Sequence, residues 1–395
     1  MKKVFVTGLG IVSAIGDTVD ENRTSLIQGR SGIGTLDLTS TRYASLLPFA
    51  EIKIESRILK EDLKVSDKGV TRTTLLAIKA FNEAIIDGGL STSQLIDIST
   101  SLIGATTVGG MCLTNELYND ANLTSGGSEY LSSYDFASVH FFLQKRYQIQ
   151  GIVNTFNTAC SSSANAIMYG SRLIKNGLAK RVIVGGVDSL AKFTINGFNS
   201  LFILSNEKCK PFDQDRSGLN LGEAAAYLVL ESEEVVGKKK VYAELTGYCN
   251  ANDAFHSSSL SNEGIGAYKA MSGALSSAKI LPHQISFINT HGTGTENNDL
   301  VESRAMLKLF GKEKPFISTK ANTGHTLGAA GAVEAVFSVL NIWHQEIYPS
   351  LNFNNAIPET SLKPELKYRN ANLQHVISNS FGFGGNCTSL IFSKI

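Results

Sequence analysis

One cysteine in this sequence is well placed to act as a nucleophile. Cys160 lies between a short β-prone segment, 151–157, and a segment whose apolar residues recur at helical spacing until Gly177. Free N–H groups at a helix start favour a thiolate and could hold an oxyanion. A buried structural cysteine is an equal alternative, because free cysteine commonly behaves as a small hydrophobe. The polar run Ser161–Ser163 argues against an apolar pocket around the sulfur.

Two histidines could supply the other groups that acyl chemistry needs. His291 and His325 each follow a predicted strand and lie beside a glycine. Taken alone, a histidine in such a turn is more often a hydrogen-bonded structural residue than a catalyst. Together with Cys160, and with Lys320 and Glu334 nearby in the sequence, the set favours acyl transfer.

The elements that must position these side chains alternate between strand and helix, which predicts a layered α/β fold. The strand–turn–helix pattern around His325, 315–343, repeats the layout around Cys160. We therefore expect an internal duplication with the site at the junction of two halves. The charged segment 233–240 divides them. The half 1–236 would carry the cysteine, and the half 237–395 would carry both histidines.

Composition excludes several classes of protein. The 395 residues are 43% hydrophobic with a net charge of +1, so no overall field indicates nucleic acid or membrane as a partner. The segment Met1–Gly8 is predicted as a first strand rather than a signal peptide, and no long apolar run follows. Five scattered cysteines without a C-x-x-C pair favour a reducing cytoplasm over disulfides or zinc.

Five motifs in order resemble the elongating β-ketoacyl-acyl-carrier-protein synthases of the thiolase superfamily, across essentially the whole chain. The initiating branch, which pairs its cysteine with a histidine and an asparagine, resembles this chain less. The resemblance implies a thiolase-like five-layer αβαβα fold of two duplicated halves. It also implies a decarboxylative Claisen condensation without metal or other cofactor, on substrates carried by the phosphopantetheine arm of acyl carrier protein. The motifs are Val6–Gly10, Thr158–Ser162, Asn289–Thr295, Lys320–His325 and Asn379–Gly385.

The resemblance also implies a role for each reacting group. Cys160 would take the acyl group, and its backbone N–H with that of Phe383 would hold the tetrahedral oxyanion. Neutral His291 and His325 would stabilise the enolate left when carbon dioxide departs. Lys320 and Glu334 would have electrostatic and orienting roles, although a purely structural ion pair explains them equally well.

Substrate and partner contacts follow from the same resemblance. Thr293, Thr295 and Ser258 would bind the pantetheine arm, and Phe381 and Phe383 would contact the substrate, with Phe383 as a gate for the acyl chain. The partner would be an acidic acyl carrier protein, and the enzyme a homodimer or a heterodimer with a related subunit. Candidate basic residues for docking the carrier are Lys64, Lys68, Arg72, Lys208 and Lys210.

Three departures from the family pattern favour a divergent branch, such as the synthases of aryl polyene and related pigment pathways. They are Glu296–Asp299, Gly384–Cys387 and Asp67–Thr73. A non-catalytic partner subunit that sets chain length is the main alternative, but retention of the cysteine and both histidines argues against it. A cysteine hydrolase is a further alternative. A dinucleotide-binding protein is disfavoured because Ser13 stands where the third glycine of that motif belongs.

Overall fold

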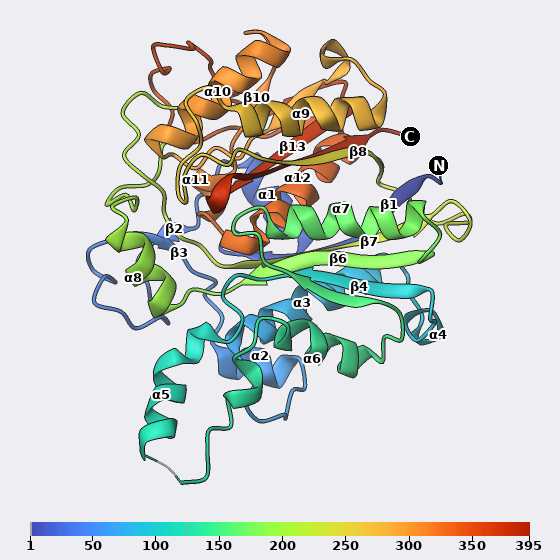
Figure 1. Cartoon of the computed structure of the whole chain (residues 1–395), viewed down its shortest axis with the longest axis vertical. Coiled ribbons are helices and arrows are strands. Elements are labelled where there is room, and N and C mark those ends of the chain that lie inside the picture. The colour runs from blue at the N-terminus through green and yellow to red at the C-terminus, as the bar shows by residue number, and fades with distance from the viewer. Residues whose placement is uncertain (1, 124) are drawn as a thin grey trace.

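Two similar sets of strands meet in the middle of the computed structural model, which describes residues 2–123 and 125–395. Within these residues ten of the strands form one sheet, in the order β10-β9-β13-β14-β8-β1-β7-β6-β4-β5, and the other four form two separate pairs. β1 (Val4–Ser13) and β8 (Ala243–Asn252) pair only at Phe5 and Val6. The sheet therefore consists of two five-stranded parts, and helices lie between them and on both outer sides (Figure 1).

The two halves repeat one order of elements, as the sequence predicts. Of the five strands of each half, the second to fourth in chain order are parallel to one another, and the last pairs antiparallel with one of them. The first half contains β1, α3 (Arg72–Asp87), β4 (Thr100–Ala105), α6 (Ser138–Tyr147), β5 (Val153–Phe156), α7 (Ser162–Lys175), β6 (Arg181–Asp188) and β7 (Ala224–Ser232). The second contains β8, α9 (Ile265–Ala278), β9 (Phe287–Asn289), α10 (Glu296–Phe310), β10 (Phe316–Ile317), α12 (Ala330–His344), β13 (His375–Gly382) and β14 (Asn386–Ser393).

Shorter elements connect this framework. They are α1 (Val19–Ile27), β2 (Ile33–Gly34), β3 (Phe49–Ala50), α2 (Ser56–Asp62), α4 (Thr92–Leu95), α5 (Thr114–Leu123), α8 (Lys192–Ser200), α11 (Lys320–Thr323), β11 (Glu346–Ile347) and β12 (Arg369–Asn370). Single 3₁₀ turns occur at Met111–Leu113, Leu131–Ser133, Pro282–Gln284, Leu327–Ala329 and Phe383–Gly385.

The helices α7 and α12 form the middle layer, and small residues let them approach closely. A side-chain carbon on Gly331 would lie 2.7 Å from the backbone nitrogen of Ala164. Such a contact is too short for any residue but glycine. The window Leu327–His344 is long and apolar enough to cross a membrane, but 89% of it is buried here as the central core helix. Since both helices start at the same junction, the turns before them meet.

Two helices have boundaries that local sequence patterns do not mark. The polar segment 114–133 begins with the helix α5, none of whose residues is buried. Its Thr124 and the N-terminal Met1 lie outside the described residues, and the first strand begins at Val4. The helical part of the 315–343 pattern starts as a 3₁₀ turn at Leu327 and becomes α-helical only at Ala330.

Candidate active site

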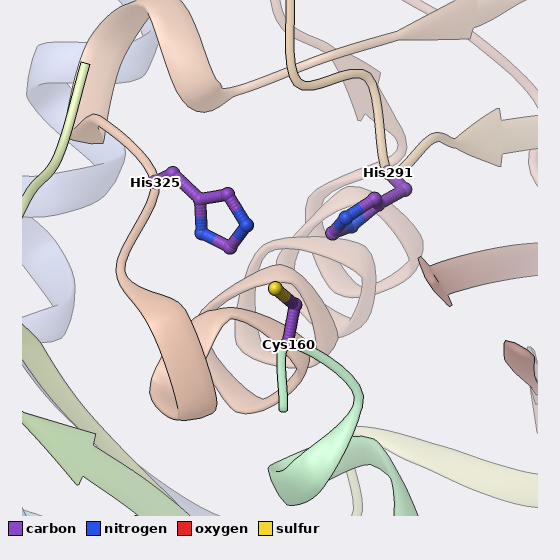
Figure 2. A group of neighbouring side chains, drawn as sticks. All are labelled: Cys160, His291 and His325. Atoms are coloured by element: carbon purple, nitrogen blue, oxygen red, sulfur yellow. The ribbon is translucent and has the colours of Figure 1, made fainter. Parts of the chain in front are cut away.

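Three side chains from the two halves converge at the junction of the turns. The sulfur of Cys160 and a ring nitrogen of each of His291 and His325 all lie within 4.8 Å of one another. All three residues are at least 95% buried. In Figure 2 the sulfur points toward the two imidazole rings, which reach it from separate loops. Cysteine and histidine are also ligands that zinc prefers, so this cluster is where a metal ion could be held.

The turn before α7 directs Cys160 toward the second half. Ala159 adopts a left-handed conformation, φ 53°, which reverses the chain between β5 and the helix. Its own backbone N–H and that of Phe383 lie near enough to the sulfur to lower the pKa of the thiol. β13 passes so close that a side-chain carbon on Gly382 would lie 2.7 Å from the carbonyl oxygen of Thr158. These two N–H groups are the pair expected to hold an oxyanion.

The thiol is harder to ionise than its position near a helix start predicts. Burial raises the pKa of Cys160 to about 11, against the lowering effects of the Lys320 ammonium and the two backbone N–H groups. The free-energy cost of removing a thiolate from water exceeds the stabilisation that Lys320 and the two N–H groups provide. The prediction that this position favours a resting thiolate is therefore wrong.

The backbone fixes the tautomer of His325. The N–H of Leu327 donates a 3.0 Å hydrogen bond to His325 Nδ1, which must therefore be the unprotonated ring nitrogen. Burial, with a contribution from Lys320, lowers the pKa of His325 well below its ordinary value. The ring is neutral at pH 7, with its single proton on Nε2.

A lysine imposes the same tautomer on His291. Lys320 Nζ lies 3.3 Å from His291 Nδ1 and also donates to the carbonyl oxygen of His291. Since an ammonium can only donate, Nδ1 accepts and the ring proton is on Nε2. Burial, then Lys320, then His325 lower the pKa of His291 well below its ordinary value. Both histidines are thus neutral hydrogen-bond donors.

Lys320 is itself held by Glu334 on α12, and both side chains are at least 97% buried. Burial raises the pKa of Glu334 to about 7, against the lowering effect of the lysine. Its Oε2 atom has no hydrogen-bond partner among the described residues. The predicted Lys320–Glu334 pair therefore exists, and it reaches one of the two histidines directly.

Glu302 on α10, which sequence reasoning missed, supports the His291 turn. Its two carboxylate oxygens accept from the backbone N–H groups of His291 and Gly292, each at 2.9 Å. The side chain of Asn379 donates to the same carboxylate. Glu302 lies outside the Asn289–Thr295 motif, and its contact depends on how α10 folds back over the turn.

Two cavities meet at the sulfur. The first, of about 400 Å³, is lined by the three converging side chains and by Thr293, Thr295, Ser258 and Phe381. The hydroxyls of Thr293 and Thr295 lie 2.8 Å apart. All the residues predicted to contact substrate thus border one space.

The second cavity, of about 370 Å³, is largely apolar and lies on the other side of Cys160. Phe198 and Phe383 line both cavities and stack on each other, with ring centroids 5.7 Å apart. Phe198 on α8 was not predicted, since no motif marks it. The aromatic pair stands between the two spaces.

One predicted surface contact is wrong. Arg72 is not a free surface cation, because its guanidinium donates to Glu223 and to the carbonyl oxygens of Ile52 and Ile54. Lys64, Lys68 and Lys208 are exposed as expected, and Lys210 pairs with Glu207. The sequence could not distinguish Arg72 from these residues because its acidic partner lies 151 positions away.

Comparison with known proteins covers the whole chain. Residues 1–235 match the family model described as beta-ketoacyl synthase, N-terminal domain, and residues 242–354 match the one described as beta-ketoacyl synthase, C-terminal domain. A Synechocystis protein named 3-oxoacyl-acyl-carrier-protein synthase 2 is 32% identical, over 100% of this chain and 98% of its own.

Solved structures give the same result. The ishigamide ketosynthase/chain length factor superposes with a TM-score of 0.91 at 26% identity, covering 100% of this chain and 99% of its own. A ketosynthase solved with its type II polyketide acyl-carrier protein and bound to the hexaketide has a TM-score of 0.89 at 25% identity, with both chains fully covered.

Proposed function

The chain belongs to the beta-ketoacyl synthase family, and we propose that Cys160, His291 and His325 carry out its condensation of an acyl group with malonyl-acyl carrier protein. The chain is an acyltransferase of the 3-oxoacyl-acyl-carrier-protein synthase type. The observation that supports these roles is the convergence of one buried thiol and two neutral imidazoles between two cavities.

The first step loads the cysteine. A carrier thioester enters through the 400 Å³ cavity, and the Cys160 sulfur attacks its carbonyl carbon. The backbone N–H groups of Cys160 and Phe383 stabilise the tetrahedral oxyanion. The new carbon–sulfur bond forms, the bond to the pantetheine sulfur breaks, and the thiol proton passes to the departing pantetheine thiolate. The acyl chain then lies in the 370 Å³ cavity beyond Phe383.

The second step forms the carbon nucleophile. A malonyl thioester takes the place of the first carrier, with its carbonyl oxygen within reach of both Nε2–H groups. As the bond to the carboxylate breaks and carbon dioxide leaves, the electron pair forms an enolate, and its oxygen accepts from His291 and His325. The enolate carbon attacks the acyl carbon on Cys160. The carbon–sulfur bond breaks, and the sulfur returns as a thiol after taking up a proton.

This division of labour explains why burial of the histidines is useful. An imidazolium at this depth would stabilise the malonyl carboxylate that has to leave. A neutral Nε2–H donor binds the carbonyl oxygen, where charge develops, without a net charge of its own. We propose that no metal or other cofactor takes part, so condensation should persist in excess EDTA.

We propose an acidic acyl carrier protein as the partner at the mouth of the first cavity. The support is the solved ketosynthase with its carrier and the position of Lys208 and Lys210. Cys209 and Lys210 lie against Gly294, between the two threonines that line the cavity. Charge-reversal of Lys208, which is exposed, should raise the KM for the carrier substrate more than it lowers kcat.

We further propose that two chains associate in the cytoplasm, with two halves per chain divided at 236/237. α5 buries none of its residues, and Tyr118, Leu123, Leu131 and Phe141 expose apolar side chains on and after it. We propose that a second copy of this chain covers these exposed apolar side chains. One structural relative bears the name of a ketosynthase with a chain length factor, so a related subunit is the other outcome. Light scattering of the purified chain distinguishes these states.

Mass spectrometry of the purified protein tests the proposal. Mixing with saturated, polyenoyl and aryl acyl-carrier thioesters should add an acyl mass to Cys160, and malonyl-carrier should then yield a product longer by two carbons. Preference for polyenoyl or aryl groups would assign the chain to a pigment-type pathway. Faster hydrolysis than condensation would indicate a hydrolase. Absence of any loading would support the non-catalytic partner subunit.

A further inference from the structure

The loop that carries Phe383 is tied to the turn that carries Cys160 through one asparagine. Asn386 is the first residue of β14 and lies opposite Gly382 in the β13–β14 pair, so it closes the base of the Phe383 loop. Gly384 and Gly385, which precede it, both have a φ of 78°. Asn386 is therefore the first residue after the flexible part of the loop that has a side chain able to anchor it.

Its side-chain oxygen is the meeting point of three elements. Asn386 Oδ1 accepts from Asn165 Nδ2 on α7 at 2.9 Å and from Asn250 Nδ2 on β8 at 2.7 Å. The Ser161 hydroxyl lies 2.8 Å away and shares its single proton between this oxygen and the carbonyl oxygen of Thr158. Ser161 directly follows the nucleophile. The contact thus crosses from the second half of the fold into the Cys160 turn.

The contacts of Asn165 extend this link to the part of the turn that precedes Cys160. Its Nδ2 group also donates to Thr158 Oγ1 at 2.8 Å, and its Oδ1 accepts from Thr388 Oγ1 at 2.8 Å. Thr158 lies two residues before the nucleophile, and Ser161 lies one residue after it. Asn386 is consequently connected to the Cys160 turn on both sides.

We infer that Asn386 is a positioning residue that sets the separation between the N–H groups of Cys160 and Phe383. Both groups act on the same sulfur and lower its pKa, yet one belongs to the first half and the other to a glycine-containing loop of the second. Asn386 is the side chain that joins their two segments. This inference rests on the proposed function, because it concerns the oxyanion formed during acyl transfer.

The consequence is specific to steps that pass through a tetrahedral oxyanion. Loading of Cys160 needs both N–H groups at the oxygen, and a misplacement of about 1 Å costs roughly 10²-fold in rate. Decarboxylation of malonyl-carrier depends on the two histidines, whose contacts do not include Asn386. Loss of the asparagine oxygen should therefore separate the two activities.

The test compares Asn386→Ala with wild type in two assays on the full chain. Loading is followed by mass spectrometry with a hexanoyl-carrier thioester, and decarboxylation by carbon dioxide release from malonyl-carrier. We expect loading to slow by about 10- to 100-fold through kcat, with decarboxylation within about twofold of wild type. Loading at the wild-type rate, or equal loss in both assays, would overturn the inference.

Two further variants guard against an effect of stability alone. Thr246→Val removes hydrogen bonds to Ile391 and Ser393 at the far end of the same β8–β14 pair, and it should lower Tm without slowing loading. Ser161→Ala removes one donor, and its effect should not add to that of Asn386→Ala, because both lose the same contact. Additive effects would contradict the link. If Asn386→Ala does not fold, Ser161→Ala alone should still slow loading severalfold without changing decarboxylation, and no slowing would contradict the inference.

Wild-type protein measured in the same two assays distinguishes failure of the proposed function from failure of the inference about Asn386. A wild type that neither loads nor decarboxylates would overturn the proposed function, and this inference with it. A wild type that does both, together with an Asn386→Ala variant that loads equally fast, would overturn the inference alone.

Discussion

The turn that carries Cys160 and the turn that carries His325 occupy equivalent places in the two halves, yet they use their backbones differently. Each follows a strand, contains a non-glycine residue with a φ of 53°, Ala159 or Leu327, and leads into a central helix. At the first turn, the backbone N–H groups of Cys160 and of Phe383, which comes from the second half, lie near the reacting sulfur. In the second, the N–H of Leu327 points at the far side of the imidazole.

The difference shows how two equivalent turns of a duplicated fold stabilise two different negative charges, the tetrahedral oxyanion and the enolate. N–H groups directed at the reaction centre can hold an oxyanion on the acyl carbon. An N–H directed at Nδ1 leaves only Nε2 to carry the histidine proton, so that proton faces the enolate oxygen. Lys320 performs the second task for His291, which has no equivalent turn N–H bonded to its ring. The comparison predicts that each turn can be damaged separately.

Removal of the nucleophile should have the largest effect. Cys160→Ala should lose acyl loading by at least about 10³-fold, because no other thiol lines either cavity among the described residues. Mass spectrometry should find no acyl adduct, and circular dichroism should be unchanged. Cys112→Ala, whose sulfur bonds to Thr73 away from the cluster, is the control. An acyl adduct on Cys160→Ala would disprove the assignment of the nucleophile.

Damage to the turn that carries His325 should mainly reduce decarboxylation. His325→Ala removes one of two enolate donors and should reduce carbon dioxide release from malonyl-carrier by about 10²- to 10³-fold. Loading should fall by less than about tenfold, since the oxyanion donors remain in place. His344→Ala, at the far end of α12, is a matched control. Equal loss of loading and decarboxylation would mean that the two turns do not stabilise separate charges.

The reactivity of the thiol should follow its buried environment. Because burial raises the pKa of Cys160 to about 11, iodoacetamide alkylation should rise about tenfold per pH unit between pH 7 and 9. Lys320→Met removes the cation that lowers this pKa, so alkylation at any given pH should slow by roughly 3- to 10-fold. Lys312→Met, on the surface, should have no effect. A rate that levels off below pH 8 would indicate a stabilised resting thiolate instead.

The smallest effects concern the two left-handed residues. Ala159→Gly relieves an unfavourable φ and should change the free energy of unfolding by less than about 1 kcal/mol. Leu327→Gly gains the same relief but loses a side chain that is 97% buried, so a net loss of roughly 2 kcal/mol or more is expected. Urea unfolding measures both. Equal changes would mean that the Leu327 side chain contributes little beyond its backbone.

The sequence was sufficient for the parts of this site that local patterns encode. The strand–turn–helix pattern recurred in both halves and correctly predicted the layered, duplicated fold. Glycines beside His291 and His325, and the small polar residues after Cys160, marked the turns that meet. The predicted thiolate was wrong because a helix start is visible in a sequence, whereas the depth of burial that raises the pKa is not.

Contacts between segments that are distant in the sequence could not be predicted from the sequence. Arg72 pairs with Glu223 only after the first half folds, and Phe198 stacks on Phe383 only after the two halves pack. Asn386 was recognised as a departure from the family pattern, but its partners lie on α7 and β8. Such pairings depend on the register of strands and on helix packing, which no local spacing specifies.

The central claim is that the two catalytic imidazoles are neutral and carry their protons on Nε2. Nitrogen-15 NMR of the histidine rings tests it most directly, with the two signals assigned by their loss in His291→Ala and His325→Ala. Both rings should show the Nε2–H tautomer from pH 6 to 9 without titrating, because burial lowers both pKa values well below the ordinary range. An imidazolium at pH 7, or an Nδ1–H tautomer in either ring, would contradict the account.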